Sequence, residues 1–250
     1  MTPKDDEQLR TQHGKKEIRN RIRDKKSYSY LGDAVLGGID GCVTTFAVAA
    51  GAVGGGFSAT VIVVLGLANL LADGFSMAVS NYLRAKSDRD EVESARKSEE
   101  KQIERIPQGE IQEVRQIFEE KGFRGETLDK VVEGITKNRN LWVNTMLTEE
   151  LGLQLEGPKP SKAGLVTFFA FLMVGLIPLL PFFVPDVNMN QQFLYSSIVT
   201  GISFLGIGMA RGLVLHKRIV TSGLLTFITG GGAAALAFLV GYFIRSIYGL

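Results

Sequence analysis

Long apolar segments alternate with charged segments along this chain. Five windows of about 20 mainly apolar residues, the length that crosses about 30 Å of hydrocarbon, can be drawn on it. They cover roughly residues 33–55, 58–83, 163–185, 191–214 and 219–244. Thirty polar residues precede the first window and it carries no small-residue cleavage pattern, so we expect it to stay in the mature protein. The pattern predicts an all-α integral membrane protein with five transmembrane helices.

Lysine and arginine residues gather on one side of the predicted membrane helices. Residues 1–30 hold nine of them, and further clusters follow the second window, precede the third and separate the fourth from the fifth. The turns at 54–57 and 185–190 hold none, and Arg245 is the single exception. Because basic residues favour the cytosolic side, we expect a cytosolic N-terminus and an external C-terminus, in either a bacterial cell membrane or a vacuolar membrane.

The basic N-terminal segment could bind nucleic acid or anionic lipids, and the sequence favours lipids. Its nine bases are mixed with five acids, and the segment adjoins a membrane helix. Attraction to the anionic headgroups of the lipid bilayer accounts for that arrangement, so no nucleic-acid partner is expected.

Residues 85–160 form the one large polar segment between windows. They hold 17 of the chain's 26 acids against 13 bases, and helices are predicted at 86–105, 108–121, 125–137 and 139–153. Pro107 should end the first of these helices. A piece this small has a small core, which bound metal or dimer contacts would help to stabilise. The expected domains are a basic segment (1–30), helices one and two (31–84), a cytosolic Glu-rich helical-hairpin metal-binding domain (85–160) and helices three to five (161–250).

Two carboxylates lie inside the apolar windows. Asp40 is the only charged residue from Ala34 to Ala72, and Asp73 interrupts the second window. A charged side chain at the bilayer centre costs roughly 2.5–3.5 kcal/mol even on a lenient scale, so such residues usually face a partner, a cavity or an ion. The pair therefore predicts a path for a cation.

Asp73 shares one stripe of its predicted helix with Asn69 and Met77, since the three are spaced four residues apart. Oxygen ligands with a thioether suit a transition metal better than Mg²⁺ or Ca²⁺, although a methionine at such a position can also be a packing residue. The small-residue pair Gly37 and Gly41 permits close helix approach, which could bring Asp40 opposite this stripe.

The polar segment carries three further pairs of metal-binding side chains, each at helical spacing. If these faces turn inward, they form an oxygen-rich pocket with one sulfur; the alternative is a solvated surface paired with nearby lysines and arginines. The segment has no Cys or His, which disfavours a tetrahedral Zn²⁺ site, and its many oxygen ligands indicate Fe²⁺, Mn²⁺ or another hard-to-borderline divalent ion. The pairs are Glu99 with Gln102, Glu110 with Glu113, and Met146 with Glu150.

Nothing in the sequence indicates an enzyme. The glycine runs at 54–56 and 230–232 lack the lysine of a phosphate-binding loop, so ATP is not expected as the energy source. Cys42 is the only thiol, and His13 and His216 lie at membrane-flanking positions. We therefore expect no permanently bound cofactor.

Taken together, these residues resemble the vacuolar iron transporter family over about residues 30–250. The resemblance implies a homodimer that exports cytosolic Fe²⁺, and often Mn²⁺, in exchange for protons. It further implies that Asp40 and Met77 line the path, and that Glu99, Glu110, Glu113, Met146 and Glu150 bind metal in the cytosolic domain. The features that carry it are Asp40-Gly41 with Thr44, Thr45 and Gly51; the run Ala72–Met77 with Tyr82 and Leu83; and Trp142, Met146, Glu149, Glu150, Leu151, Gly152 and Leu153.

Two positions depart from the family pattern. Asn69 and Gln102 stand where the family commonly has glutamates. Asn69 cannot exchange a proton, so proton coupling would have to use Asp73 or Asp40, or be altered. Gln102 keeps an oxygen ligand but removes a negative charge. A passive divalent-cation channel and a membrane-anchored metal sensor or storage module are the alternatives that the sequence leaves open.

Overall fold

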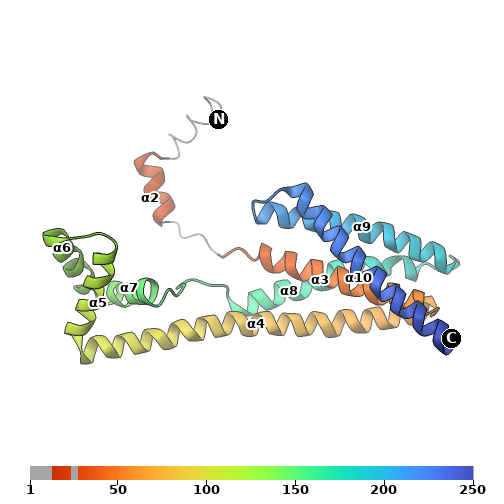
Figure 1. Cartoon of the computed structure of the whole chain (residues 1–250), viewed down its shortest axis with the longest axis horizontal. Helices are drawn as coiled ribbons and strands as arrows, with labels where there is room; N and C mark the ends of the chain where they lie inside the picture. Colours follow the sequence, from red (N-terminus) through yellow and green to blue (C-terminus); the bar gives the residue numbers. More distant parts are fainter. Residues whose placement is uncertain (1–12, 24–27, 250) are drawn as a thin grey trace.

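The structure, a computed structural model, describes residues 13–23 and 28–249, and in this part of the chain it contains helices and no strand (Figure 1). The first labelled helix is α2 (Lys15–Arg23). Much of the predicted basic N-terminal segment, including Lys4, Arg10, Lys25 and Lys26, lies outside the described residues.

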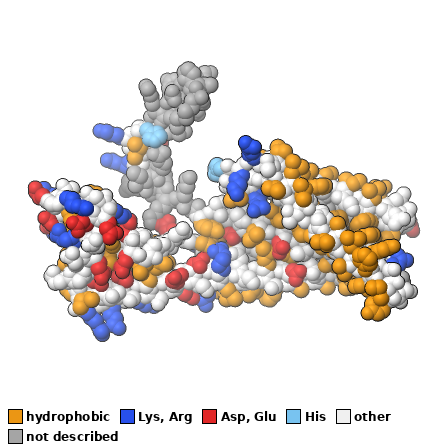
Figure 2. All heavy atoms as spheres, in the orientation of Figure 1, with side chains coloured by type: hydrophobic (Ala, Val, Ile, Leu, Met, Phe, Trp, Pro, Cys, Tyr) orange, Lys and Arg blue, Asp and Glu red, His pale blue; other side chains and the backbone are white. Residues whose placement is uncertain are grey.

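Four described helices are long and apolar enough to span a membrane: α3 (Leu31–Gly54), α4 (Ala59–Arg105), α9 (Met189–Val214) and α10 (Ile219–Tyr248). A fifth candidate is the pair α8 (Pro160–Gly175) and η2 (Ile177–Phe183). Counting this bent pair as one span gives the five predicted crossings. Most of the hydrophobic side chains visible in Figure 2 lie on this part of the molecule, mixed with uncharged polar ones and backbone.

The predicted third crossing, 163–185, is not one helix. The α-helix ends at Gly175, and the chain continues after a 40° bend as the 3₁₀ segment η2, which contains Pro178 and Pro181. Proline lacks the amide hydrogen of an α-helical turn and its ring clashes with the preceding turn, so two prolines in four residues explain the break.

The second crossing and the first helix of the polar segment form one continuous helix. α4 contains 47 residues, or about 70 Å of helix at 1.5 Å per residue. About 20 residues suffice to cross the hydrocarbon, so roughly half of α4 extends beyond the membrane. The helix ends at Arg105, two residues before Pro107, as predicted.

Three short α-helices and one π-helical turn fold back onto the far end of α4 (Figure 1). They are α5 (Pro107–Glu120), α6 (Gly125–Thr136), α7 (Arg139–Thr145) and the π turn η1 (Met146–Glu150). The helix predicted at 139–153 is therefore shorter and ends in a π turn. We call these elements with the second half of α4 the acidic bundle; it carries red and blue side chains in Figure 2. Its core contains Ile103, Val114, Leu128, Val132, Ile135, Trp142, Val143, Met146 and Leu147.

Helix α3 is the centre of the membrane part, since it packs against α4, α8, α9 and α10. The predicted close approach at Gly37 and Gly41 exists, but its partner is α8. A Cβ on Gly37 would lie 2.6 Å from the carbonyl oxygen of Thr167, and one on Gly41 would lie 2.4 Å from that of Phe171. The glycine pair therefore holds α3 against α8. We had expected these glycines to pack against the Asp73 stripe of α4, and they do not.

Candidate metal site

The membrane half of α4 carries the predicted stripe of Asn69, Asp73 and Met77 on one unbroken helix. Asp73 is exposed, whereas Asn69 and Met77 are half-buried. The side-chain nitrogen of Asn69 is buried without a hydrogen-bond partner. A buried hydrogen-bond donor without a partner is unusual. The Asn69 nitrogen lies one helical turn from the unpaired carboxylate of Asp73.

Asp40 lies half-buried on α3, near the stripe. Its carboxylate is close enough to that of Asp73 for the two charges to interact. The Thr44 hydroxyl donates to the backbone carbonyl of Asp40 at 2.9 Å, which leaves the carboxylate available for another contact. The structure thus brings the two intramembrane carboxylates near each other, from different helices.

The acidic bundle contains two buried glutamates. Glu99 on α4 is 4% exposed and Glu110 on α5 is 1% exposed. One carboxylate oxygen of each has no hydrogen-bond partner. A buried carboxylate normally needs hydrogen bonds or an opposite charge, so these two oxygens are available to a ligand.

Glu113 and Glu150 lie exposed beside this buried pair, near enough for mutual repulsion. Burial and then the charges of the other glutamates raise the pKa of Glu110 to about 7. The pKa values of Glu99 and Glu150 are also raised, in both cases first by burial and then by neighbouring carboxylates. Four acids from α4, α5 and η1 therefore form one electrostatically coupled cluster.

Two basic residues close in sequence to this cluster bind other acids. Lys97 pairs with Glu93 at 2.8 Å and Arg115 with Asp129 at 2.7 Å. None of the ion pairs among the described residues includes a glutamate of the cluster. The interpretation of these glutamates as a solvated surface paired with lysines and arginines does not fit Glu99 and Glu110.

Met146 and Gln102 complete the predicted set. Met146 is fully buried in the core and opens the π turn that ends at Glu150, and Gln102 donates to Glu99 at 3.3 Å. Within the described residues, however, no group of three or more Asp, Glu, His and Cys side chains is arranged to hold an ion. The cluster gathers the side chains without bringing them to ligand geometry.

A third polar group, absent from the sequence prediction, joins α3, α4 and α8. The Asn81 side chain donates to Asp33 at 2.9 Å and to the hydroxyl of Thr167 at 2.8 Å. Asp33 is buried, and its second carboxylate oxygen has no partner. The sequence signal was weak because Asp33 lies at the edge of an apolar window, where a charge is ordinary.

Most of the chain is similar in sequence to one known protein family. The sequence model of the VIT family matches residues 31–242, from the start of α3 into α10. The vacuolar iron transporter of Toxoplasma gondii is 34% identical over 232 residues, which cover 89% of this chain and 77% of that protein. The vacuolar iron transporter of Centaurea cyanus is 35% identical over 209 residues, covering 82% and 84%. Vacuolar iron transporter 1 of Arabidopsis thaliana is 31% identical over 207 residues, covering 82% of each chain.

Proposed function

The chain belongs to the VIT family, and we propose that it is a membrane transporter that exports Fe²⁺ from the cytosol in exchange for protons, with Mn²⁺ as a second substrate. The observation that carries this proposal is the pair of neighbouring carboxylates on α3 and α4, Asp40 and Asp73, inside the membrane-spanning part. The names of the relatives support iron as the cargo, and a transporter rather than an enzyme.

In this proposal the transported ion passes between the two carboxylates. Asp40 holds the cation, and Met77 supplies a soft ligand that favours Fe²⁺ over Mg²⁺ or Ca²⁺. Asp73 lies between Asn69 and Met77 on the same stripe and carries the exchanged proton, because an amide such as Asn69 cannot. A cation that approaches a protonated carboxylate favours its ionised form, so metal binding releases a proton.

The acidic bundle collects metal before transport. Glu99, Glu110, Glu113 and Glu150 supply oxygen ligands, Gln102 an amide oxygen and Met146 a sulfur. The carboxylate oxygens of Glu99 and Glu110 that lack hydrogen-bond partners support this role. A bound cation would give both oxygens a partner and relieve the repulsion within the cluster. Because the side chains are not yet at ligand geometry, the bundle must tighten around the ion.

We further propose that the transporter is a homodimer. Asp73 is exposed on a single chain at membrane depth, where contact with lipid would be costly. A second copy that covered this face of α4 would remove the cost and enclose the path from the other side.

The proposal is tested by Fe²⁺ flux in proteoliposomes of the full chain, with and without a pH gradient. We expect a gradient to drive uptake, and Asp40→Ala to reduce flux to the level of empty liposomes while the protein still inserts. Thr229→Ala is the matched control, because Thr229 lies exposed on α10 and its hydroxyl only binds the Leu225 carbonyl of its own helix.

Three outcomes would contradict the proposal. Near-normal flux in folded Asp40→Ala protein would remove the carboxylate path. Flux that ignores pH gradients of both directions would favour a passive channel, and binding of metal without any flux would favour a membrane-anchored sensor or storage module.

A further inference from the structure

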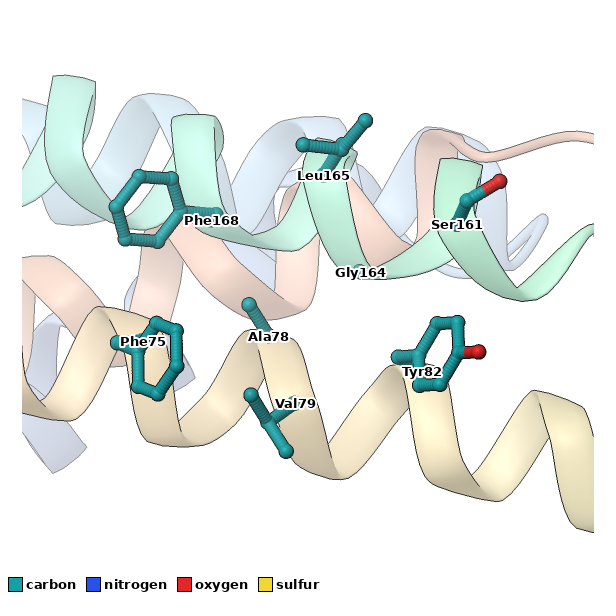
Figure 3. A pocket seen from close by; sticks show the side chains of 8 residues that line it. All are labelled: Phe75, Ala78, Val79, Tyr82, Ser161, Gly164, Leu165 and Phe168. Carbon is teal, nitrogen blue, oxygen red and sulfur yellow. The ribbon is translucent and has the colours of Figure 1, made fainter.

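An apolar groove runs between α4 and α8 on the outside of the membrane part (Figure 3). It has a volume of about 490 Å³, and its lining includes Phe75, Ala78 and Tyr82 from α4 and Ser161, Gly164 and Phe168 from α8. At its floor the helices nearly touch, since a Cβ on Gly164 would lie 2.9 Å from the carbonyl oxygen of Ala78. Phe75 is 65% exposed, so the groove is open to whatever surrounds the membrane helices.

The two ends of the groove differ in polarity. The hydroxyl groups of Tyr82 and Ser161 lie at one end, and the rings of Phe75 and Phe168 lie toward the other (Figure 3). The polar end is the one nearer the acidic bundle, because α4 leads from Phe75 through Tyr82 toward it. Tyrosine is enriched at membrane–water boundaries, so Tyr82 marks the membrane surface on this side.

Two exposed cations continue the groove beyond this boundary. Lys86 and Arg89 follow Tyr82 on α4 by four and seven residues, which keeps them on the same helix face. Among the described ion pairs, neither Lys86 nor Arg89 has an acidic partner. The charge of Arg89 acts on Glu93, whose own ion pair is with Lys97.

We propose that this groove binds an anionic phospholipid. One acyl chain lies between Phe75 and Phe168, and the phosphate is held by Lys86 and Arg89 at the boundary. From Phe75 to Tyr82 the helix rises about 10 Å, which covers most of the roughly 15 Å of hydrocarbon in one leaflet. An apolar groove that ends in a set of cations matches the two chemical parts of such a lipid, whereas a neutral lipid would leave the cations without a counter-charge.

A second copy of the chain is the competing occupant, and the helix geometry disfavours it. Phe75 follows Asp73 by two residues, or about 200° around the helix, so the groove and the Asp73 stripe face nearly opposite directions. A copy that covered Asp73 would leave the groove in contact with lipid. The lipid site is thus separate from the metal path.

Native mass spectrometry of the full chain, released from nanodiscs of equal phosphatidylglycerol and phosphatidylcholine, tests the inference. We expect wild-type protein to retain phosphatidylglycerol preferentially, and Lys86→Ala to weaken that retention about fivefold, the effect of removing one cation near an anionic surface. Lys101→Ala is the matched control, because it makes the same change at an exposed site of α4 in the acidic bundle. It should retain lipid as wild type does.

The substitution Ala78→Leu tests whether an acyl chain binds in the groove. The larger side chain fills the groove at mid-depth and should reduce retention of both lipids. Equal retention of the two lipids by wild type, or wild-type retention of phosphatidylglycerol by Lys86→Ala, would overturn the headgroup assignment. Unchanged retention of both lipids by Ala78→Leu would show that no acyl chain binds in the groove. Cross-linking between two copies of Val79→Cys, a position in the same groove, would make the groove a protein interface instead.

Discussion

Glu110 is the residue at which burial and charge conflict most. Its side chain is 1% exposed, one oxygen has no partner, and its nearest charged neighbours include other carboxylates. Burial and that repulsion raise its pKa to about 7, so near neutral pH the site holds a proton about half of the time. A metal ion must displace this proton to bind the carboxylate.

Metal affinity of the acidic bundle should therefore fall as the pH falls through about 7. For a single displaced proton the expected loss between pH 7 and pH 6 is about fivefold, and the raised pKa values of Glu99 and Glu150 act in the same direction. Titration of the full chain with Mn²⁺, followed by fluorescence of Trp142, the only tryptophan and part of the bundle core, measures it.

Glu110→Gln should bind metal more weakly at pH 8 and lose most of the pH dependence. Glu126→Gln is the control, because Glu126 is exposed on α6 and pairs only with Lys130. If Glu110→Gln and wild type give the same affinity at every pH, Glu110 is not a ligand.

At this scale the sequence predicted which residues share a helix face, but not which of them are buried. Spacing placed Glu99 with Gln102 and Glu110 with Glu113, and both pairs lie on the predicted helices. Helical glutamates are ordinarily solvated, and Glu99 and Glu110 become buried where α5 and η1 pack against α4. Asp33 was missed for the same reason, since its burial depends on α4 and α8.

At the scale of helices, Gly41 sets how closely α3 packs on α8. A Cβ there would lie 2.4 Å from the Phe171 carbonyl oxygen, which is backbone and cannot move without the helix. Gly41→Ala should therefore destabilise the protein by about 1–3 kcal/mol, the usual effect of overpacking. Thermal melting of the full chain in detergent, read as loss of monodisperse protein, measures this.

Gly206→Ala is the matched control, because that glycine is exposed inside α9 and an added Cβ would meet nothing within 4 Å. Alanine is the better helix former, so this change should stabilise by about 0.5–1 kcal/mol. A Gly41→Ala protein as stable as Gly206→Ala would show that the α3–α8 contact can relax.

Helix positions could be predicted where apolar windows and proline marked them. The end of α4 before Pro107 followed from the pattern alone. The break in the third crossing was missed because an apolar window shows only that a segment is long enough to cross the membrane. It does not show whether the backbone is α-helical throughout, and Pro178 and Pro181 were the available signal. The π turn at Met146–Glu150 has no comparable sequence marker.

For the whole molecule, the sequence predicted that two carboxylates enter the membrane but could not establish what surrounds them. The structure places them on neighbouring helices and leaves Asp73 exposed. In the proposed homodimer a second chain covers that face, and one sequence cannot position that chain. Transport measurements are therefore the best way to decide which of Asp40 and Asp73 binds the metal and which carries the proton.

Proton coupling should depend on Asp73, because Asn69 cannot ionise and Asp73 is the carboxylate one turn along the same stripe. Asp73→Asn should leave downhill Fe²⁺ movement in proteoliposomes measurable but make it insensitive to a pH gradient. Asp40→Asn should lose both, since it removes the metal ligand. Asp90→Asn makes the same change on α4 outside the apolar window and should behave as wild type. If the flux through Asp73→Asn still follows the pH gradient, the proton travels by another group, and Asp40 or the buried Asp33 becomes its carrier.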